Sequence, residues 1–233
     1  MTSAKAMLGA IAGRFLFRVS RVDAVQAFGR FRRVEVSGTS LREVAWRPGD
    51  KVQVFLPDVG MRTYTPLFWE TRGATAFLAY VHGETPGAAW ANGVKAGDEV
   101  SFFGPRRSIE VSDVEAPLAV FGDETSVALA LTLAAARPTR KVTAVLEVND
   151  RADVRAALDA CGSLLDVHLV ERVNANTHLP VAVEHLRSAL ASGAFGVFTG
   201  RASSIQTVKQ SLRGLDFASK TKAYWAEGKR GLD

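Results

Sequence analysis

Two short motifs carry residue types that bind a phosphorylated ligand with an aromatic ring. The first is Arg62-Thr63-Tyr64-Thr65, in which a cation and a flat ring alternate with two threonines. On a strand, alternate side chains share a face, so Arg62 and Tyr64 should point one way and the threonines the other. A guanidinium pairs with phosphate through parallel hydrogen bonds, and a tyrosine stacks on planar rings. The motif predicts a ligand with both groups.

The second motif, HGETPGAAW, runs from His82 to Trp90. Its small residues allow backbone N–H groups to approach an anion, and Pro86 suits the first turn of a helix. A helix N-terminus favours a pyrophosphate, because its first N–H groups have no partner in the helix. We predict that Gly87, Ala88 and Ala89 meet a pyrophosphate here, although an ordinary Pro/Gly turn also fits the pattern.

Two further motifs each follow a predicted strand and open a predicted helix. Gly122-Asp123-Glu124-Thr125 lacks the GxGxxG pattern of a full dinucleotide fingerprint. Its acids suit a helix cap near the positive end of the dipole, but they would repel a phosphate, which argues against a P-loop-like role. The other motif is Gly200-Arg201-Ala202-Ser203, whose arginine is either a nucleotide contact or a surface charge.

The choice between NADH and NADPH stays open. Glu147, Asp150 and Arg151 follow the second predicted strand of the second half, where the nucleotide ribose usually lies. A carboxylate there suits the 2′-hydroxyl of NADH, and an arginine suits the 2′-phosphate of NADPH. Arg151 and Arg201 favour NADPH, while the two nearby acids would repel that phosphate.

Composition narrows the class of protein. The 233 residues are 47% hydrophobic and carry a net charge of +5. Residues 1–47 hold nine Lys/Arg and three Asp/Glu, a surplus of six, so the remaining chain is at −1. This basic segment suits solvated strand faces as well as an anionic partner. The basic residues are not interleaved with aromatics as in single-strand binders, so we expect no nucleic-acid partner.

Cysteine and histidine usage excludes several kinds of site. Cys161 is the only cysteine, so no internal disulfide or cysteine-rich metal site is expected. No HxxH or HExxH spacing occurs among the histidines, and we predict no protein metal site. The apolar stretch 7–13 is cut by Arg14, so we predict no signal peptide. No apolar run approaches the ~18 residues of a membrane span, and we expect a soluble, cytoplasmic monomer.

The order of elements predicts two domains. Strands are expected at 15–20, 31–37, 51–56, 62–69, 75–81 and 98–103, after a leading helix at 4–13 and with a second helix at 86–94. Such short strands predict a six-stranded antiparallel β-barrel. Later strands (118–121, 141–148, 165–170, 195–199, 220–225) alternate with helices (125–136, 152–161, 181–192, 203–213), which predicts a parallel α/β sheet. With 113–117 as linker, the domains are 1–112 and 113–233.

These motifs together resemble the siderophore-interacting protein family. The RTYT motif, the HG…PGAAW segment, GDET and the tail from Ala223 to Lys229 occur in the family's order, from about residue 14 to the end. The resemblance implies an FAD-dependent ferric-siderophore reductase with ferredoxin-reductase architecture, in which NAD(P)H is the co-substrate. Many relatives have Gly-Glu-Ala-Ser where this chain has Gly-Arg-Ala-Ser, so Arg201 is a departure.

The resemblance also implies roles for residues. Thr65 should hydrogen-bond near the reactive flavin nitrogen, and His82 should lie in the FAD site. Tyr224 and Trp225 fit either the core of an edge strand or a lid over the outer flavin face. The predicted FAD-binding residues are Arg62, Thr63, Tyr64, Thr65, His82, Gly83, Gly87, Ala88, Ala89, Trp90, Thr125, Tyr224 and Trp225. The predicted nucleotide-binding residues are Asp123, Glu124, Thr125, Ser126, Arg151, Gly200 and Arg201. Ferric siderophores are often anionic, and the basic candidates for them are Arg106, Arg107, Lys220 and Lys222.

The predicted function is reduction of a ferric siderophore by NAD(P)H through FAD. No side chain is assigned a catalytic role, because the flavin carries the redox chemistry and the protein supplies orientation and electrostatics. Two alternatives remain. One is a general flavin or ferredoxin-type reductase with a protein partner, and the other is a non-catalytic FAD-binding module.

Overall fold

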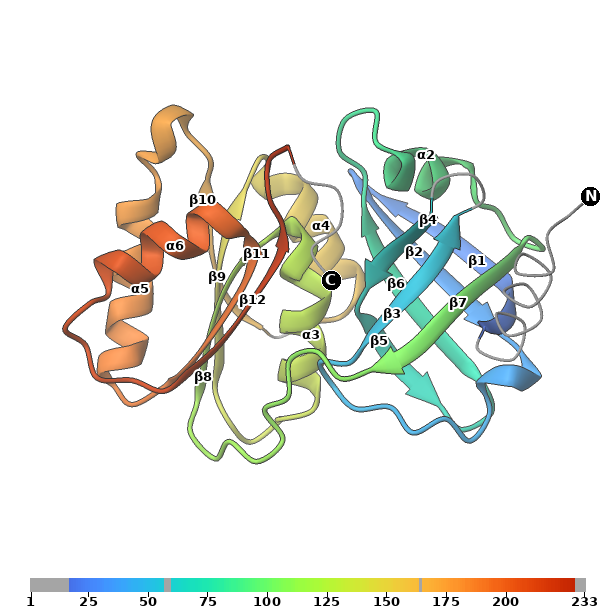
Figure 1. Cartoon of the computed structure of the whole chain (residues 1–233), viewed down its shortest axis with the longest axis horizontal. Coiled ribbons are helices and arrows are strands. Elements are labelled where there is room, and N and C mark those ends of the chain that lie inside the picture. Colours follow the sequence, from blue (N-terminus) through green and yellow to red (C-terminus); the bar gives the residue numbers. More distant parts are fainter. Residues whose placement is uncertain (1–16, 57–59, 164, 229–233) are drawn as a thin grey trace, which may run out of the picture. The chain divides into compact units, whose positions relative to one another are not determined.

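The computed structural model describes residues 17–56, 60–163 and 165–228. The chain divides into two compact units (Figure 1). One comprises Met1–Gln26 with Arg32–Arg107, and the other Ala27–Phe31 with Ser108–Asp233. The assignment of cofactors to an FAD-binding domain over 1–112 and an NAD(P)H-binding domain over 113–233 stays a prediction.

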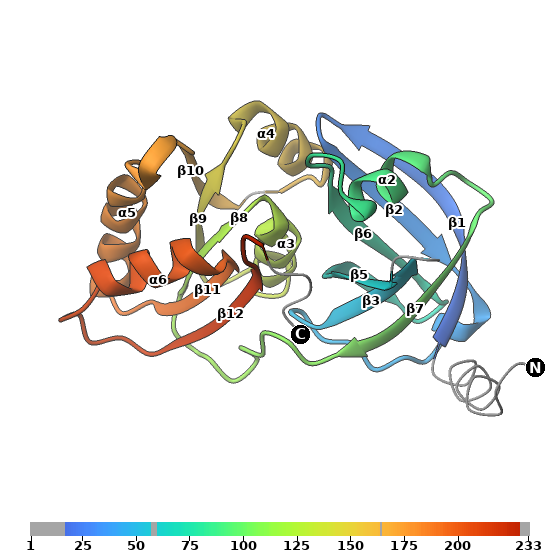
Figure 2. The same cartoon turned by 45° about the horizontal axis from the view of Figure 1, so that its top comes forward.

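The first unit is a seven-stranded sheet in the order β4-β3-β7-β1-β2-β6-β5. The pairs β1–β7, β3–β4, β3–β7 and β5–β6 are antiparallel. Figure 2 shows this sheet curling, with helix α2 (Pro86–Gly93) beside β6. The strands are β1 (Phe17–Phe28), β2 (Phe31–Ser37), β3 (Lys51–Leu56), β4 (Gly60–Tyr64), β5 (Pro66–Glu70), β6 (Ala74–Tyr80) and β7 (Glu99–Arg106), with a 3-10 turn at Thr39–Leu41.

Antiparallel architecture was predicted correctly, but the number of strands was not. The expected strand 62–69 is two strands, β4 and β5, separated at Thr65. Pro66 explains the break, since proline has no N–H to donate to a ladder. Within the described ranges no ladder joins the edge strands β4 and β5, so the sheet is not a closed barrel. β1 continues to Phe28 instead of ending near residue 20, and the expected helix 4–13 lies outside the described residues.

The inner face of this sheet places the first motif. Val52 and Val54 are fully buried on β3, and they pair directly with Tyr64 and Arg62 on β4. Directly opposed residues share a face of the sheet. Arg62 and Tyr64 therefore lie on the inner face together, as the alternation predicted.

The second unit is a five-stranded parallel sheet in the order β10-β9-β8-β11-β12. Its strands are β8 (Leu118–Asp123), β9 (Val142–Val148), β10 (Asp166–Glu171), β11 (Phe195–Arg201) and β12 (Ser219–Trp225). Its helices are α3 (Val127–Ala135), α4 (Arg151–Ala160), α5 (Leu179–Ala191) and α6 (Ala202–Ser211), with 3-10 turns at Glu124–Ser126 and Asn174–Asn176. This confirms the predicted parallel α/β sheet.

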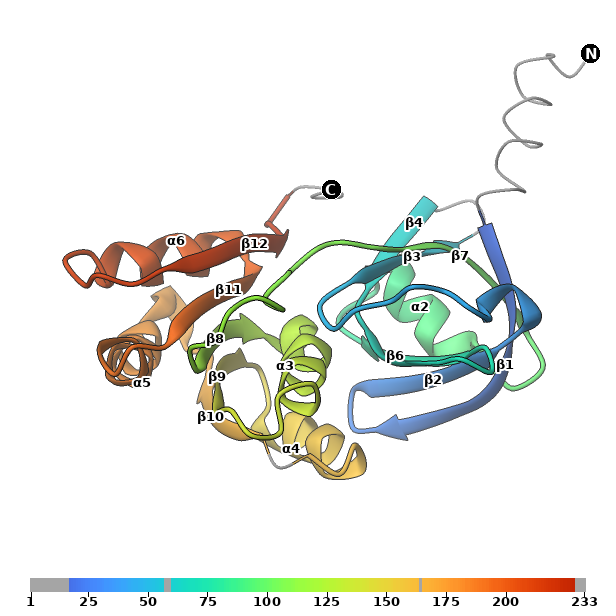
Figure 3. The ribbon, with the colours of Figure 1, turned by 90° about the horizontal axis from the view of Figure 1, so that it is seen from below.

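Helices cover both faces of the parallel sheet (Figure 3). α3 and α4 lie on one face, and α5 and α6 on the other. Every residue of β8 and β9 is buried, as expected for central strands that are covered on both sides. In the part of the chain that the structure describes, no helix is long and apolar enough to cross a membrane.

Candidate functional site

The two motifs of the first unit meet at the start of α2. A Cβ atom added to Gly87 would lie 3.6 Å from the Tyr64 hydroxyl and 3.7 Å from Cγ of Arg62. The ring of Trp90, one turn further along α2, lies 5.6 Å from the ring of Tyr64. The structure thus brings together Arg62, Tyr64, Gly87 and Trp90, which the sequence placed in one ligand site.

Hydrogen bonds at the start of α2 restrict which N–H groups face a ligand. The Thr85 side chain caps the helix by accepting from Ala88 N–H at 3.3 Å, and Ala89 N–H donates to the Thr85 carbonyl at 2.9 Å. Pro86 has no N–H. Within the described residues, Gly87 is therefore the position in this turn whose N–H is left for an anion.

These groups fit the phosphate part of FAD. The Arg62 guanidinium is half-exposed and gives one N–H to the carbonyl of Met61 at 2.8 Å, which leaves further donors of the same group. The side chain starts on the inner face, beside the N-terminus of α2. The aliphatic Cγ and Cδ of Arg62 lie 3.7 and 3.8 Å from a Cβ added to Gly87. A cation and a helix N-terminus are the two features that stabilise a bound phosphate.

The Tyr64 ring is packed more deeply than a surface stacking residue. Its centroid lies 6.2 Å from that of Phe77, with the planes 28° apart. Burial raises the pKa of the Tyr64 phenol to about 12, and the positive charge of Arg62 acts in the opposite direction. Stacking of Tyr64 on a flavin stays a prediction.

The remaining predicted residues of the first unit are spread around this cluster. Thr63 is exposed on the outer face, opposite Gln53, while Thr65 is largely buried. The His82 ring stacks on Tyr80 at 6.0 Å, and Gly83 has a positive φ of 54°. Their contacts with FAD stay predictions.

In the second unit, Asp123 organises the carboxyl end of β8. It is fully buried, and its carboxylate accepts from the N–H and the hydroxyl of Thr125 and from the indole N–H of Trp225. Burial raises the pKa of Asp123, and the hydrogen bonds from Thr125 and Trp225 act against that rise. Gly200 leaves the space for this carboxylate: an added Cβ would lie 2.6 Å from Oδ2, and φ is +90°. Asp123 is therefore a buried anchor.

Glu124 is also turned into the protein. It is 4% exposed and accepts two parallel hydrogen bonds from Arg172, at 2.9 and 2.8 Å. It also accepts from Asn149 N–H at 2.6 Å. Burial acts to lower the pKa of Arg172, but the hydrogen bonds and charge of Glu124 outweigh it and raise that pKa. Ser126 is fully buried as well, so Thr125 is the residue of this turn that keeps partial exposure.

A second buried carboxylate, Glu147, lies on the neighbouring strand β9. Its Oε2 is 2.9 Å from Nε2 of His178, whose Nδ1 accepts from the N–H of Val173, so Nε2 donates. Arg172 and Arg201 lie 3.8 and 4.0 Å from the same carboxylate. Glu147 is fully buried, which removes it from the set of residues that reach a ribose directly.

The two arginines proposed for nucleotide choice differ in their surroundings. The Arg201 side chain is 13% exposed and donates to Ser204 at 2.9 Å and to Asn176. The Arg151 side chain is 55% exposed, 3.8 Å from the equally exposed Glu171. Asp150 caps α4 by accepting from Ala152 N–H at 2.7 Å. Arg151 is thus the arginine with the freer guanidinium.

The basic substrate candidates fall in both units. In the first, Arg106 donates to Gln53 and lies over the Phe103 ring at 4.9 Å. In the second, Lys220 donates to the Glu110 carbonyl. The roles of Arg106, Arg107, Lys220 and Lys222 stay predictions.

Sequence reasoning missed Arg172, His178 and Asn176. They come from the end of β10 and the segment that leads to α5, and they are joined to Glu124, Glu147 and Arg201 only by folding. The sequence could have pointed to them only through their position. They follow a strand whose carboxyl end lies at the edge where open α/β sheets bind ligands.

Residues 58–109 match the family model of the siderophore-interacting FAD-binding domain. This match confirms the resemblance drawn from the motifs, and it identifies FAD as the cofactor of this domain type. The matched segment contains Arg62, Tyr64, Gly87 and Trp90. No curated protein matches the chain.

Solved structures show the same fold over nearly the whole chain. A siderophore utilization protein from T. fusca is 22% identical, with a TM-score of 0.71, covering 93% of this chain and 95% of its own. The siderophore-interacting protein SipS from Aeromonas hydrophila is 20% identical, with a TM-score of 0.71 and coverage of 92% and 93%. A ferredoxin NADP+ reductase from Neisseria gonorrhoeae, with FAD and NADP bound, is 12% identical, with a TM-score of 0.68 and coverage of 90% and 99%. The TM-scores and the coverage, at sequence identities this low, show that the chain has a ferredoxin-reductase-like fold.

Proposed function

We propose that this chain is a flavoprotein reductase that takes a hydride from NAD(P)H and passes electrons to a ferric siderophore. The observation that carries the proposal is the cluster of Arg62, Tyr64 and the Gly87 turn, inside the segment that matches a siderophore-interacting FAD-binding domain. The NADP-bound neighbour supports NAD(P)H as the reductant, and two siderophore-related neighbours support the acceptor.

The residues of the chain itself would bind FAD and the nucleotide and orient them. Arg62 and the N–H of Gly87 hold a phosphate, and Trp90 keeps Tyr64 packed beside them. When bound, FAD supplies the hydride-accepting and electron-donating chemistry. At the other unit, Thr125 presents a partly exposed side chain at the carboxyl edge of the sheet, where a nucleotide is expected.

The first test is the identity of the cofactor. The purified protein should be yellow, and heat should release FAD, identified by chromatography. Release of FMN, or failure to bind any flavin on reconstitution, would contradict the proposed site.

The second test separates an enzyme from a binding module. NAD(P)H should bleach the bound flavin rapidly under anaerobic conditions, whereas a non-catalytic module would keep its oxidised spectrum.

The third test concerns the acceptor. With a ferric siderophore present, a ferrous-iron chelator should develop colour at a rate that depends on enzyme and NAD(P)H. Reduction of an iron–sulfur protein in place of the siderophore would support the ferredoxin-type alternative.

A further inference from the structure

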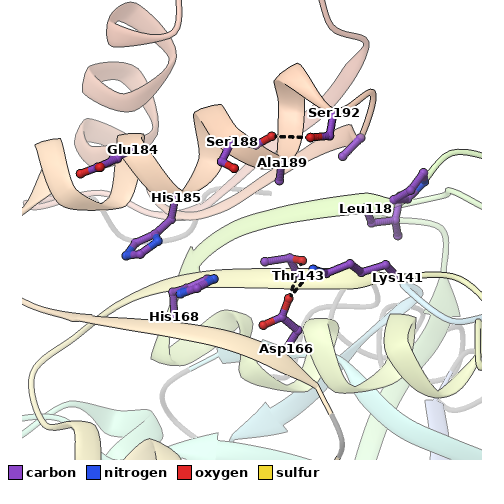
Figure 4. Close-up of a pocket in the computed structure, with 12 residues that line it drawn as sticks. Leu118, Lys141, Thr143, Asp166, His168, Glu184, His185, Ser188, Ala189 and Ser192 are labelled. Carbon is purple, nitrogen blue, oxygen red and sulfur yellow. Dashed lines mark hydrogen bonds and ion pairs between the residues drawn. The ribbon is translucent and has the colours of Figure 1, made fainter.

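Two histidines stack across the contact between α5 and β10. The ring centroids of His168 on β10 and His185 on α5 lie 4.0 Å apart, with the ring planes 14° apart (Figure 4). Both side chains are half-buried, and both line a cavity of about 440 Å³ at the amino ends of β8, β9 and β10. Neither histidine is among the residues assigned to FAD, nucleotide or substrate, so the proposed function does not use the stack.

A contact this close suits neutral imidazoles better than protonated ones. Two protonated rings would place like charges face to face with centroids 4.0 Å apart, and like charges at such a distance repel. A single protonated ring would lose part of its hydration against the other ring. Partial burial accordingly lowers the pKa of His168 below its ordinary value of 6.5, and the positive charge of His185 acts in the same direction.

The charged groups that face the stack do not reverse this direction. Asp166 acts to raise the pKa of His168, but Lys141 acts to lower it. The Asp166 carboxylate is also held by the Lys141 ammonium and the Thr143 hydroxyl, each at 3.0 Å. From the helix side, the cavity is lined by the exposed carboxylate of Glu184, the chain neighbour of His185. Burial and the second imidazole therefore decide the direction of the pKa.

Histidines contact the sheet at two places along α5. His178, immediately before the helix, lies 2.9 Å from Glu147 at the carboxyl edge. His185 follows about two helical turns later, on the same side of the helix, and contacts His168 near the amino ends of the strands. We propose that the His168–His185 stack is an acid-sensitive latch, which holds α5 on β10 while both rings are neutral and opens when they take up protons. The adjoining cavity gives the separated rings space for hydration.

Acid should therefore loosen α5 over a defined range of pH. Between the lowered pKa of His168 in the folded state and its ordinary value of 6.5, the open state binds a proton that the closed state does not. The contribution of the closed stack is thus fully present above pH 6.5 and is lost as the pH falls through this range.

The opening should extend to the carboxyl edge of the sheet. Asn176 and His178 lie in the segment that leads into α5, and they contact Arg201 and Glu147. A helix that separates from β10 carries this segment with it. The backbone of residues 172–178 should therefore lose protection from solvent together with that of α5.

The experiment is amide hydrogen exchange of the full-length protein without nucleotide, at about pH 7.5 and about pH 5.5, on the two sides of the ordinary histidine pKa. Labelling times are scaled for the intrinsic exchange rate at each pH, and peptides from α4 are the internal reference. We expect peptides from α5 and from residues 172–178 to lose protection relative to α4 at the lower pH. Because no nucleotide is present, this result does not depend on the proposed reductase activity.

Three variants assign the effect to the stack. The double variant His168→Phe/His185→Phe keeps two rings that cannot be protonated, so its α5 should be equally protected at both pH values. Ser188→Ala changes an exposed residue of the same cavity and should keep the acid sensitivity of the wild type. In His185→Gln, NMR should show His168 titrating at a higher pH than in the wild type, because the second positive charge is gone.

The proposal is overturned if the wild type shows no acid-dependent loss of protection in α5 relative to α4. It is also overturned if the double phenylalanine variant shows the same loss as the wild type. Should that variant fail to fold, His185→Gln decides the matter, since an unchanged titration of His168 would show that the two imidazoles are not coupled.

Discussion

The indole N–H of Trp225 donates a 2.7 Å hydrogen bond to the fully buried carboxylate of Asp123. These residues are 102 positions apart, at the ends of β12 and β8. The tail that resembles the family's C-terminal signature is therefore fixed to the GDET motif by one side-chain contact. Two motifs that the sequence presented separately form one structural unit.

Asp123→Asn should release Trp225 while keeping most of the helix cap. The amide oxygen still accepts from Thr125, but the NH₂ group faces the indole N–H, so two donors meet in a buried site. We expect a loss of about 1–3 kcal/mol of stability, measured by chemical denaturation, with a red-shifted emission from Trp225.

The matched variant is Trp225→Phe, which removes the N–H and retains a ring. In that background Asp123→Asn should cost clearly less, because the donor–donor conflict is gone. Equal costs in both backgrounds would show that the Asp123–Trp225 bond contributes nothing.

Arg62→Ala should lose FAD while the apoprotein stays folded. Removal of a charged phosphate contact costs ~1.5–3 kcal/mol of binding, or about one to two decades in affinity, measured by flavin fluorescence on titration of the apoprotein. Arg21→Ala, on the exposed side of β1, is the control and should bind FAD normally. Equal flavin retention in the two variants would move the phosphate site elsewhere.

Tyr64 should titrate far above an ordinary tyrosine, because burial raises its pKa to about 12 from 10.0. Between these values the folded state keeps the proton that the unfolded state has lost. Stability is therefore fully present below pH 10 and falls as the pH rises toward 12. The measurement is the tyrosinate absorbance of the apoprotein, compared with that of Tyr64→Phe; loss of a component that titrates near 10 in this variant would contradict the packing.

Arg151 and Arg201 should differ in their effect on nucleotide choice. Arg201 is held by Ser204 and Asn176, whereas the ion pair of Arg151 is with the exposed Glu171, at 3.8 Å. If NADPH is the preferred reductant, Arg151→Ala should lower the ratio of the flavin-reduction rate with NADPH to that with NADH about tenfold. A loss of that size corresponds to one charged contact to a 2′-phosphate. Arg201→Ala should weaken the binding of both nucleotides equally and leave the ratio unchanged. Stopped-flow reduction of the flavin gives both ratios, and an unchanged ratio in Arg151→Ala would return this residue to a surface role.

Local patterns predicted the architecture well. Period-two alternation placed Arg62 and Tyr64 on one face, and strand–helix alternation predicted the parallel sheet. The break between β4 and β5 was missed because apolar residues continue beyond it. Pro66 itself indicates a break, since proline cannot donate to a strand ladder.

Long-range pairing explains what the sequence could not predict. Asp123 and Glu124 have the composition of a simple helix cap, and their burial depends on Trp225 and Arg172, which are distant in the chain. The stacked histidines at 168 and 185 likewise have no recognisable spacing, because a helix and a strand bring them together.

Gly200 limits how the chain can vary at the carboxyl edge of its parallel sheet. Any other residue would have to adopt a φ of +90° and place a Cβ 2.6 Å from the Asp123 carboxylate. Saturation mutagenesis should therefore find this position intolerant even of alanine. The shape of the turn after β11 is therefore set by the volume of one buried carboxylate on the neighbouring strand β8.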